Sequence, residues 1–323
     1  AAVTSGVSIS HPGAVTGSLG RIAKAVKETG LRSCLCYEVS DRDGAAVAEE
    51  GLEENAAFAR ECASATDPQL RTLFGLHAAF TISDGTLEKA ARLGKDAGVG
   101  FHVHVAEAAS DVAANRAKYG KSSARRLIDH GILGKGSIAA HAVHCDDADK
   151  DALAASGTWV VHNPQSNLNN AVGIADVLGL VKRGVPVGLG TDAMTVNMLE
   201  EVRVALCAQH LRQDNPSCGF MELTGALFVR NPEIASALWG FPIGTLAEGS
   251  AADVILVDYL APTPLNDSTV LGHLVFGISQ AVVDTTICGG RVLMHGRKLE
   301  IGLDEEALAA ESRRLATALW ERF

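Results

Sequence analysis

The sequence predicts a parallel α/β fold: a closed, TIM-type (β/α)8 barrel followed by a small β unit. Short β-branched runs alternate with longer amphipathic runs at intervals of roughly 30 residues, the pattern of parallel strands joined by right-handed helical crossovers. Seven such repeats favour a closed barrel over an open doubly wound sheet, and no GxGxxG follows any strand to indicate a dinucleotide site. The expected strands are Val7–Ser10, Ser33–Val39, Thr72–His77, Gly100–Val105, Ser137–Val143, Thr158–His162 and Val185–Leu189.

Helices are expected between these strands. Val15–Thr29 has apolar residues at helical spacing, and Gly30 follows as a stop signal. A second helix begins at the capping residue Ser83 and closes at Gly98. The same pattern predicts helices at 147–156 and 197–212.

The pattern changes after about Gly219, where a helix, an isolated strand, a two-stranded hairpin and a closing helix are expected. These elements lie in order at Leu223–Trp239, Ala252–Tyr259, Ala281–Glu300 and Asp304–Arg322. The hairpin turns at Gly289–Gly290. We therefore expect a barrel over residues 1–240, a partial β domain over 241–300 and a C-terminal helix over 301–323.

Composition excludes several classes of protein. The 323 residues include 28 Lys+Arg and 38 Asp+Glu, a net charge of −10, which argues against a nucleic-acid partner. No run approaches the roughly 18 uncharged apolar residues of a membrane helix. The seven cysteines are odd in number and form no CxxC motif, so we expect a reduced, cytoplasmic protein with buried thiols.

Polar residues collect at the C-terminal ends of the expected strands. Seven of the 11 histidines lie there, namely His11, His77, His102, His104, His141, His144 and His162. In a parallel barrel these ends open on one face, where active sites are built. The other four histidines are expected to have packing or surface roles.

The densest group is the stretch HVHVAE at residues 102–107. Strand alternation places His102 and His104 on one face, where imidazoles suit a divalent metal, and Glu107 can serve as a general acid and base. The alternative is a pair of satisfied polar residues inside the barrel. Of His141 and His144, one is expected to be structural.

Asp192 ends the last strand, where a nearby metal would explain a carboxylate among apolar residues; a helix N-cap is the alternative. The segment from His162 to Asn167 is either a turn of capping residues or a substrate contact. His77 and Glu38 carry weaker signals. Two histidines, an aspartate and an adjacent glutamate together predict an open catalytic zinc or iron site that binds water.

These residues stand in recognisable motifs. They are HVHVAE at 102–107, AH at 140–141, VHNPQSNL at 161–168, GLGTD at 188–192, and IGTLAEG at 243–249 leading into ADVILVD at 252–258. As a set they resemble the amidohydrolase superfamily, in the branch of chlorohydrolases and of cytosine, guanine and S-adenosylhomocysteine deaminases. Within that branch the chain is most similar to aminohydrolases associated with selenium and purine metabolism.

The resemblance implies a role for each site residue. His104 and Asp192 would ligate the metal, and Asp192 would help deprotonate the water. His141 would orient that water and is a third candidate ligand, while Glu107 would shuttle the proton. The substrate-facing candidates are Glu38, His77, His162, Asn163 and Asn167. Ala79 stands where the family has proline, which weakens the assignment of His77.

The resemblance also implies a missing part. The family carries a His-x-His pair on its first barrel strand, preceded by half of a β-sandwich, and neither is found here. Val7–Ser10 corresponds to the second strand. We therefore expect a fragment that lacks the first strand and binds metal weakly, with the C-terminal β unit as half of a composite β-sandwich.

The expected function is hydrolytic deamination of a purine, pyrimidine or related nitrogen heterocycle by water on one divalent metal, Zn²⁺ or alternatively Fe²⁺. The same site could instead release halide or open a cyclic amide. A third possibility is an inactive fragment or non-catalytic scaffold. The resemblance also implies a homo-oligomer.

Overall fold

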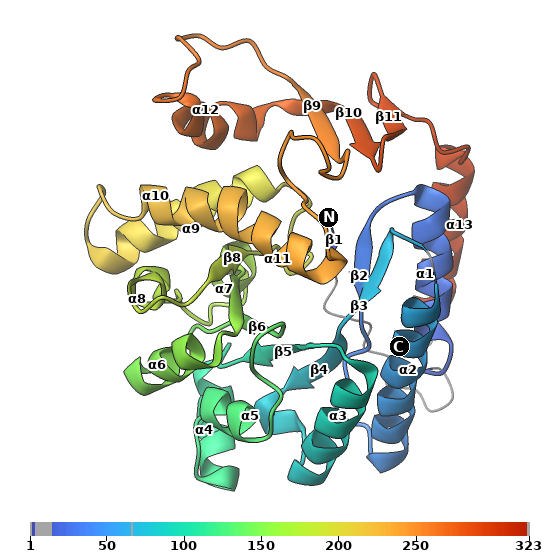
Figure 1. The fold of residues 1–323 in the computed structure, drawn as a ribbon, viewed down its shortest axis with the longest axis vertical. Helices are drawn as coiled ribbons and strands as arrows, with labels where there is room; N and C mark the ends of the chain where they lie inside the picture. The colour runs from blue at the N-terminus through green and yellow to red at the C-terminus, as the bar shows by residue number, and fades with distance from the viewer. Residues whose placement is uncertain (1, 4–14, 66, 322–323) are drawn as a thin grey trace.

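The computed structural model describes residues 2–3, 15–65 and 67–321. Its centre is a parallel sheet of five strands in chain order, with each strand hydrogen-bonded to the next (Figure 1). The strands are β4 (Phe74–Ala78), β5 (Phe101–Val105), β6 (Ile138–His141), β7 (Trp159–His162) and β8 (Val187–Leu189). Because every neighbouring pair is parallel, all carboxyl ends point to the same side.

A second parallel sheet continues the first. It contains β1 (Ala2–Val3), β2 (Ser33–Leu35) and β3 (Leu70–Thr72), and only Leu73 separates β3 from β4. A single bridge between Val39 and Leu76 joins the two sheets. Together they form one curved surface, and no pairing between β8 and β1 occurs in the part of the chain that the structure describes. The expected parallel α/β class is confirmed, whereas closure of the barrel is not shown.

The side chain of Asn55 bridges the chain directly after β2 and the strand β4. Its Oδ1 accepts from the backbone N–H of Tyr37 at 2.8 Å, and its Nδ2 donates to the carbonyls of Tyr37 at 2.8 Å and Gly75 at 3.2 Å. Gly75 is required there, because a Cβ would lie 2.2 Å from the Tyr37 carbonyl oxygen. This buried amide replaces ladder hydrogen bonds, and the strand expected to reach Val39 therefore ends at Leu35.

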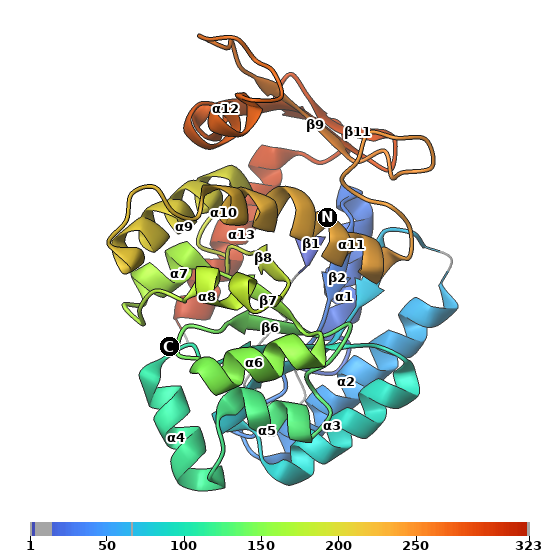
Figure 2. The same cartoon turned by 60° about the vertical axis from the view of Figure 1, so that its left-hand side comes forward.

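Helices cover the outer side of the strands in both views (Figures 1 and 2). They are α1 (Ser18–Thr29), α2 (Ala45–Ser64), α3 (Asp84–Ala97), α4 (Ala109–Tyr119), α5 (Ser123–Asp129), α6 (Asp147–Ser156), α7 (Pro164–Asn169), α8 (Val177–Lys182), α9 (Met198–Gln213), α10 (Phe220–Gly225) and α11 (Asn231–Trp239). The expected stops at Gly30 and Gly98 are both left-handed C-caps, and the Ser83 side chain caps α3. The expected strand Val7–Ser10 and His11 lie outside the described residues.

The C-terminal part contains an antiparallel sheet with the strand order β12-β11-β10-β9. A small β unit was expected there from the sequence. Its strands are β9 (Val254–Asp258), β10 (Val282–Cys288), β11 (Arg291–His295) and β12 (Lys298–Leu299), with helices α12 (Val270–Phe276) and α13 (Glu305–Trp320). The sheet is tied to the parallel strands by Arg32, whose buried guanidinium donates to both carboxylate oxygens of Asp253 at 2.8 and 3.1 Å. The domain boundaries expected at residues 240 and 300 stay predictions.

Two clusters of buried apolar residues pack against the strands. The larger lies between strands and helices, and the smaller includes Cys34, Cys36, Leu73 and Ile138 with residues of α11. The two cysteines are thus core residues, as expected, and all seven cysteines are free of disulfides. None of the helices in the described part combines the length and apolar composition needed to cross a membrane.

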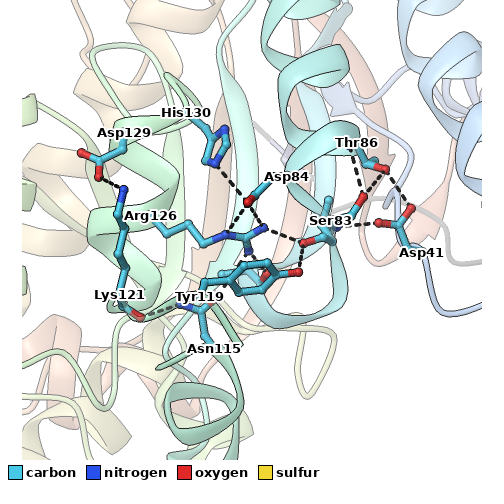
Figure 3. Close-up of polar contacts among 12 residues, drawn as sticks. Asp41, Ser83, Asp84, Thr86, Asn115, Tyr119, Lys121, Arg126, Asp129 and His130 are labelled. Atoms are coloured by element: carbon cyan, nitrogen blue, oxygen red, sulfur yellow. Dashed lines mark hydrogen bonds and ion pairs between the residues drawn. The ribbon is translucent and has the colours of Figure 1, made fainter. Parts of the chain in front are cut away.

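The loops after β2 and β4 are joined by a polar network (Figure 3). Arg126 of α5 is its centre, with a side chain only 1% exposed. The guanidinium donates to Asp84 and to the carbonyl of Ile82 at 2.9 Å, and it lies 3.4 Å from the centre of the Tyr119 ring. Another N–H of Arg126 donates to the carbonyl of Ala79. The network therefore fixes the 3-10 turn Ala79–Thr81, directly after β4.

Replacing Arg126 with alanine is expected to destabilise the protein by about 2–5 kcal/mol, because the carbonyls of Ala79 and Ile82 lose their buried donor. Arg125 is the matched control, since it lies on the same helix, is 62% exposed and pairs with Asp129. Its replacement is expected to cost less than about 1 kcal/mol. Urea unfolding of both variants measures the difference. Equal losses would contradict the assigned role of Arg126.

Candidate functional site

His104 lies near the end of β5 with its ring orientation fixed by backbone. The β4–β5 register shifts between Leu76 and Ala78, so His77 is the extra residue of a bulge. The carbonyl oxygen of His77 accepts a hydrogen bond from Nδ1 of His104. Glu38 also approaches, with Oε1 3.4 Å from the same nitrogen. Because Nδ1 carries the hydrogen, Nε2 of His104 keeps its lone pair.

His141 ends β6 in an unusual backbone conformation. Its φ is +73°, in the left-handed region, and the following Ala142 has φ of +52°. The imidazole is 1% exposed, and its Nδ1 lies 2.8 Å from Nδ2 of Asn167. Nε2 points the other way and lies 3.7 Å from Oε2 of Glu107. Glu107 is held in turn by Nδ2 of Asn170, 3.3 Å from its Oε1.

Asp192 follows β8 and also has a left-handed backbone, with φ of +47°. The hydroxyl of Ser166 donates to its Oδ2. Gly190, two residues earlier, leaves room for the side chain of Asn163, because a Cβ there would lie 2.3 Å from Oδ1 of Asn163. The carboxylate of Asp192 is exposed, in contrast to His141. One short helix, α7, thus contacts both His141 and Asp192.

Ligand atoms of His104, His141 and Asp192 all lie within 4.8 Å of one another. Two imidazoles and one carboxylate from three strand ends are the donor set of an open catalytic zinc site, which leaves room for water. The residues present therefore fit a divalent metal. A second group, formed by Glu38, His77 and His104, meets the same distance limit and shares His104 with the first.

Burial keeps the rings of His77 and His141 neutral. Desolvation, with Arg42 and His104 nearby, lowers the pKa of His77 to about 3. Desolvation and the neighbouring His104 lower the pKa of His141 to about 4. Burial raises the pKa of Glu38 above its usual range. At neutral pH both imidazoles are therefore uncharged, the form that binds metals.

Not every expected residue joins this cluster. His162 is 1% exposed, neither of its ring nitrogens has a partner among the described residues, and strand alternation places it on the face opposite to Asn163. His102 is buried, with its ring centre 5.9 Å from that of His104. His144 is the structural member of its pair, because its Nε2 hydrogen-bonds the Val172 carbonyl at 2.6 Å.

Three polar contacts were missed by sequence reasoning. Thr81 lies 2.8 Å from Nδ1 of His77, Ser166 binds Asp192, and Asn170 binds Glu107. Ser166 stands inside the motif at 161–168, which was the only available signal for it. Nothing in the spacing of Thr81 or Asn170 pointed to the site.

Comparisons with known proteins agree with this geometry. The model of the amidohydrolase family matches residues 2–293. A 5-methylthioadenosine/S-adenosylhomocysteine deaminase of Pelotomaculum thermopropionicum is 35% identical over 309 residues, 94% of this chain and 70% of the relative. A 5'-deoxyadenosine deaminase of Methanosarcina mazei is 35% identical over 306 residues, 93% of this chain and 69% of the relative.

Solved structures share the fold. An adenosine deaminase from Xanthomonas campestris with bound zinc superposes with a TM-score of 0.80 at 25% identity, covering 93% of this chain and 69% of the other. A triazine hydrolase variant has a TM-score of 0.78 at 20% identity, with 93% and 68% covered, which shows likeness of fold alone.

The buried His162 predicts sensitivity to acid. Desolvation lowers the pKa of His162 from 6.5 to about 3. Below pH 6.5 this histidine is therefore protonated in the unfolded chain but stays neutral in the folded chain. The free energy of unfolding is expected to decrease as the pH is lowered from 6.5 to 3. His162→Leu should reduce that slope by up to about 1.4 kcal/mol per pH unit.

Urea unfolding of the parent and of His162→Leu between pH 7 and 4 measures this slope. The exposed His295 on β11 provides the control, since His295→Leu should keep the parental dependence on pH. Parallel curves for the parent and the His162 variant would contradict the prediction.

Proposed function

The chain belongs to the amidohydrolase family, and we propose that it is a metal-dependent hydrolytic deaminase of an adenosine-type nitrogen heterocycle. The observation that carries this proposal is the convergence of His104, His141 and Asp192 within 4.8 Å, with Glu107 beside His141. The deaminases at 35% identity support the reaction and the nucleoside-like substrate class. Family membership also supports a complete eight-stranded barrel, of which the two parallel sheets would be parts, and a composite β-sandwich.

His104, His141 and Asp192 would hold the metal, zinc being the ion that this donor set favours and Fe²⁺ the alternative. The bound ion supplies Lewis acidity that lowers the pKa of water toward about 7. If Nε2 of His141 does not ligate the ion, the same lone pair would instead accept a hydrogen of the attacking water and orient it. The carboxylate of Asp192 would help to remove a proton, and Ser166 holds that carboxylate in place.

Glu107 is proposed as the proton shuttle. Its Oε1 accepts a hydrogen bond from Asn170, while its Oε2 faces Nε2 of His141 and would exchange the proton. In the reaction a water oxygen bonds to the ring carbon that bears the amino group, and the C–N bond to that group breaks. Glu107 takes the proton of the water and delivers it to the substrate, so that ammonia leaves.

His77 and Glu38 are proposed to face the substrate, because both lie beside His104 at the carboxyl ends of the strands. The low pKa of His77, about 3, makes it a neutral hydrogen-bonding group. Asn163 and Asn167 are 5% and 1% exposed and contact His141 from behind. His162 is buried on the other face of β7, so we assign it no contact with substrate. The homo-oligomeric, cytoplasmic state stays a prediction.

Glu107→Gln should lower ammonia release from zinc-loaded protein by about 10²- to 10⁴-fold, because the amide cannot carry the proton. Zinc content should not change. The assay uses a panel of adenosine-type nucleosides and other aminated heterocycles, with Glu49→Gln, an exposed partner of Lys89, as the control. Halide or a ring-opened product from chlorinated or cyclic-amide substrates would instead support those reactions. No ammonia from any compound would refute deamination.

Asp192→Ala should weaken zinc binding by more than the 10- to 100-fold typical of residues behind a ligand. Asp214 is a close control, because it too has a left-handed backbone, with φ of +48° against +47° for Asp192. Replacing either aspartate by alanine therefore changes backbone strain in a similar way. Competition with a zinc chelator measures the affinity, and equal affinities in the two variants would remove Asp192 from the ligand set. A parent chain without zinc would favour the inactive-fragment alternative.

A further inference from the structure

The side chain of Asn167 meets His141 in a way that leaves a hydrogen-bonding conflict. Nδ2 of Asn167 lies 2.8 Å from Nδ1 of His141, and Nδ2 of Asn163 lies 3.5 Å from the same nitrogen. Both amide nitrogens are donors, while Nδ1 offers at most one lone pair. Meanwhile Oδ1 of Asn167 is buried and has no partner among the described residues. A buried acceptor, Oδ1 of Asn167, thus lacks a hydrogen bond while two donors approach Nδ1 of His141.

Rotation of the Asn167 amide by about 180° around the Cβ–Cγ bond exchanges the positions of Oδ1 and Nδ2. Oδ1 then accepts a hydrogen from Nδ1 of His141, and a single donor is left near that nitrogen. Asn163 is less suited to this role, because its Oδ1 is directed at the space kept open by Gly190. The amide of Asn167 is therefore the group that can give Nδ1–H an acceptor.

The backbone holds Asn167 where this hydrogen bond needs it. The residue is 1% exposed on α7, its N–H donates to the carbonyl of Asn163 at 3.0 Å, and its carbonyl accepts from Val172 at 3.1 Å. The adjacent Ser166 binds Asp192 from the same helix. His104 shows the same arrangement, since its Nδ1 donates to the carbonyl of His77. Both imidazoles would then present Nε2 toward the shared space.

We propose that Asn167 is a positioning residue whose side-chain carbonyl oxygen accepts the hydrogen of Nδ1 in His141 and fixes its tautomer. Nε2 of His141 is thereby left with a lone pair, directed toward Glu107 and the other donor atoms. The inference deepens the proposed function and rests on it for the use of that lone pair. Without the acceptor, the proton moves to Nε2, where the carboxylate of Glu107 lies 3.7 Å away and favours it.

The tautomer can be read directly by long-range ¹H–¹⁵N NMR of the histidine rings in the metal-free chain. The signal of His141 is identified by its loss in His141→Gln. We expect the proton on Nδ1 in the parent chain and in Asn167→Asp, whose carboxylate only accepts. In Asn167→Leu, which is similar in size and lacks an acceptor, we expect the proton on Nε2.

Zinc affinity, measured by chelator competition, gives a second readout. Asn167→Leu should bind zinc about 10- to 100-fold more weakly, while Asn167→Asp should bind at least as tightly as the parent. Asn169→Ala is the control, because this exposed residue lies on the same helix and its side chain, among the described residues, bonds to Asn170. It should change neither the NMR signal nor the affinity.

A parent chain with the proton on Nε2 overturns the proposal, as does an Asn167→Leu variant with the parental tautomer. If Asn167→Leu does not fold, the spectra of the parent and of Asn167→Asp still decide the position of the proton. The proposed function fails separately: absence of ammonia release with the expected tautomers refutes deamination and leaves the role of Asn167 intact.

Discussion

The hydrogen bond from Nδ1 of His104 to the carbonyl oxygen of His77 is the interaction on which the site depends. In a regular parallel ladder that carbonyl would be engaged by the neighbouring strand. The bulge at His77 leaves it free, and so one irregularity both aims the His77 side chain and fixes the ring of His104. The orientation of His104 is therefore a property of the β4–β5 pair as much as of the residue itself.

The loops behind this bulge are built to keep it in place. Arg126 binds the carbonyl of Ala79, the first residue of the turn that carries Thr81, and the carbonyl of Ile82, directly after that turn. Thr81 in turn hydrogen-bonds His77. His141 and Asp192 both have strained, left-handed backbones. Helix α7 holds both side chains in place, because Asn167 contacts His141 and Ser166 hydrogen-bonds Asp192.

The sequence predicted those features that local rules determine. Gly30, Ser83 and Gly98 mark helix ends because capping chemistry is local, and the strand ends gathered His104, His141 and Asp192 because parallel strands share a direction. The bulge at His77 and the bridging amide of Asn55 depend on contacts between distant segments, so no local pattern showed them. His162 was expected at the open face from its place in a motif, yet it occupies the alternate strand position and is buried.

Asp192 is exposed, His104 is partly covered and His141 is buried, so the three proposed ligands lie at different depths. A cation arriving from bulk solvent would reach the carboxylate before either imidazole. The outermost group would then govern how fast the ion exchanges, and the two deeper nitrogens would govern the preference among ions.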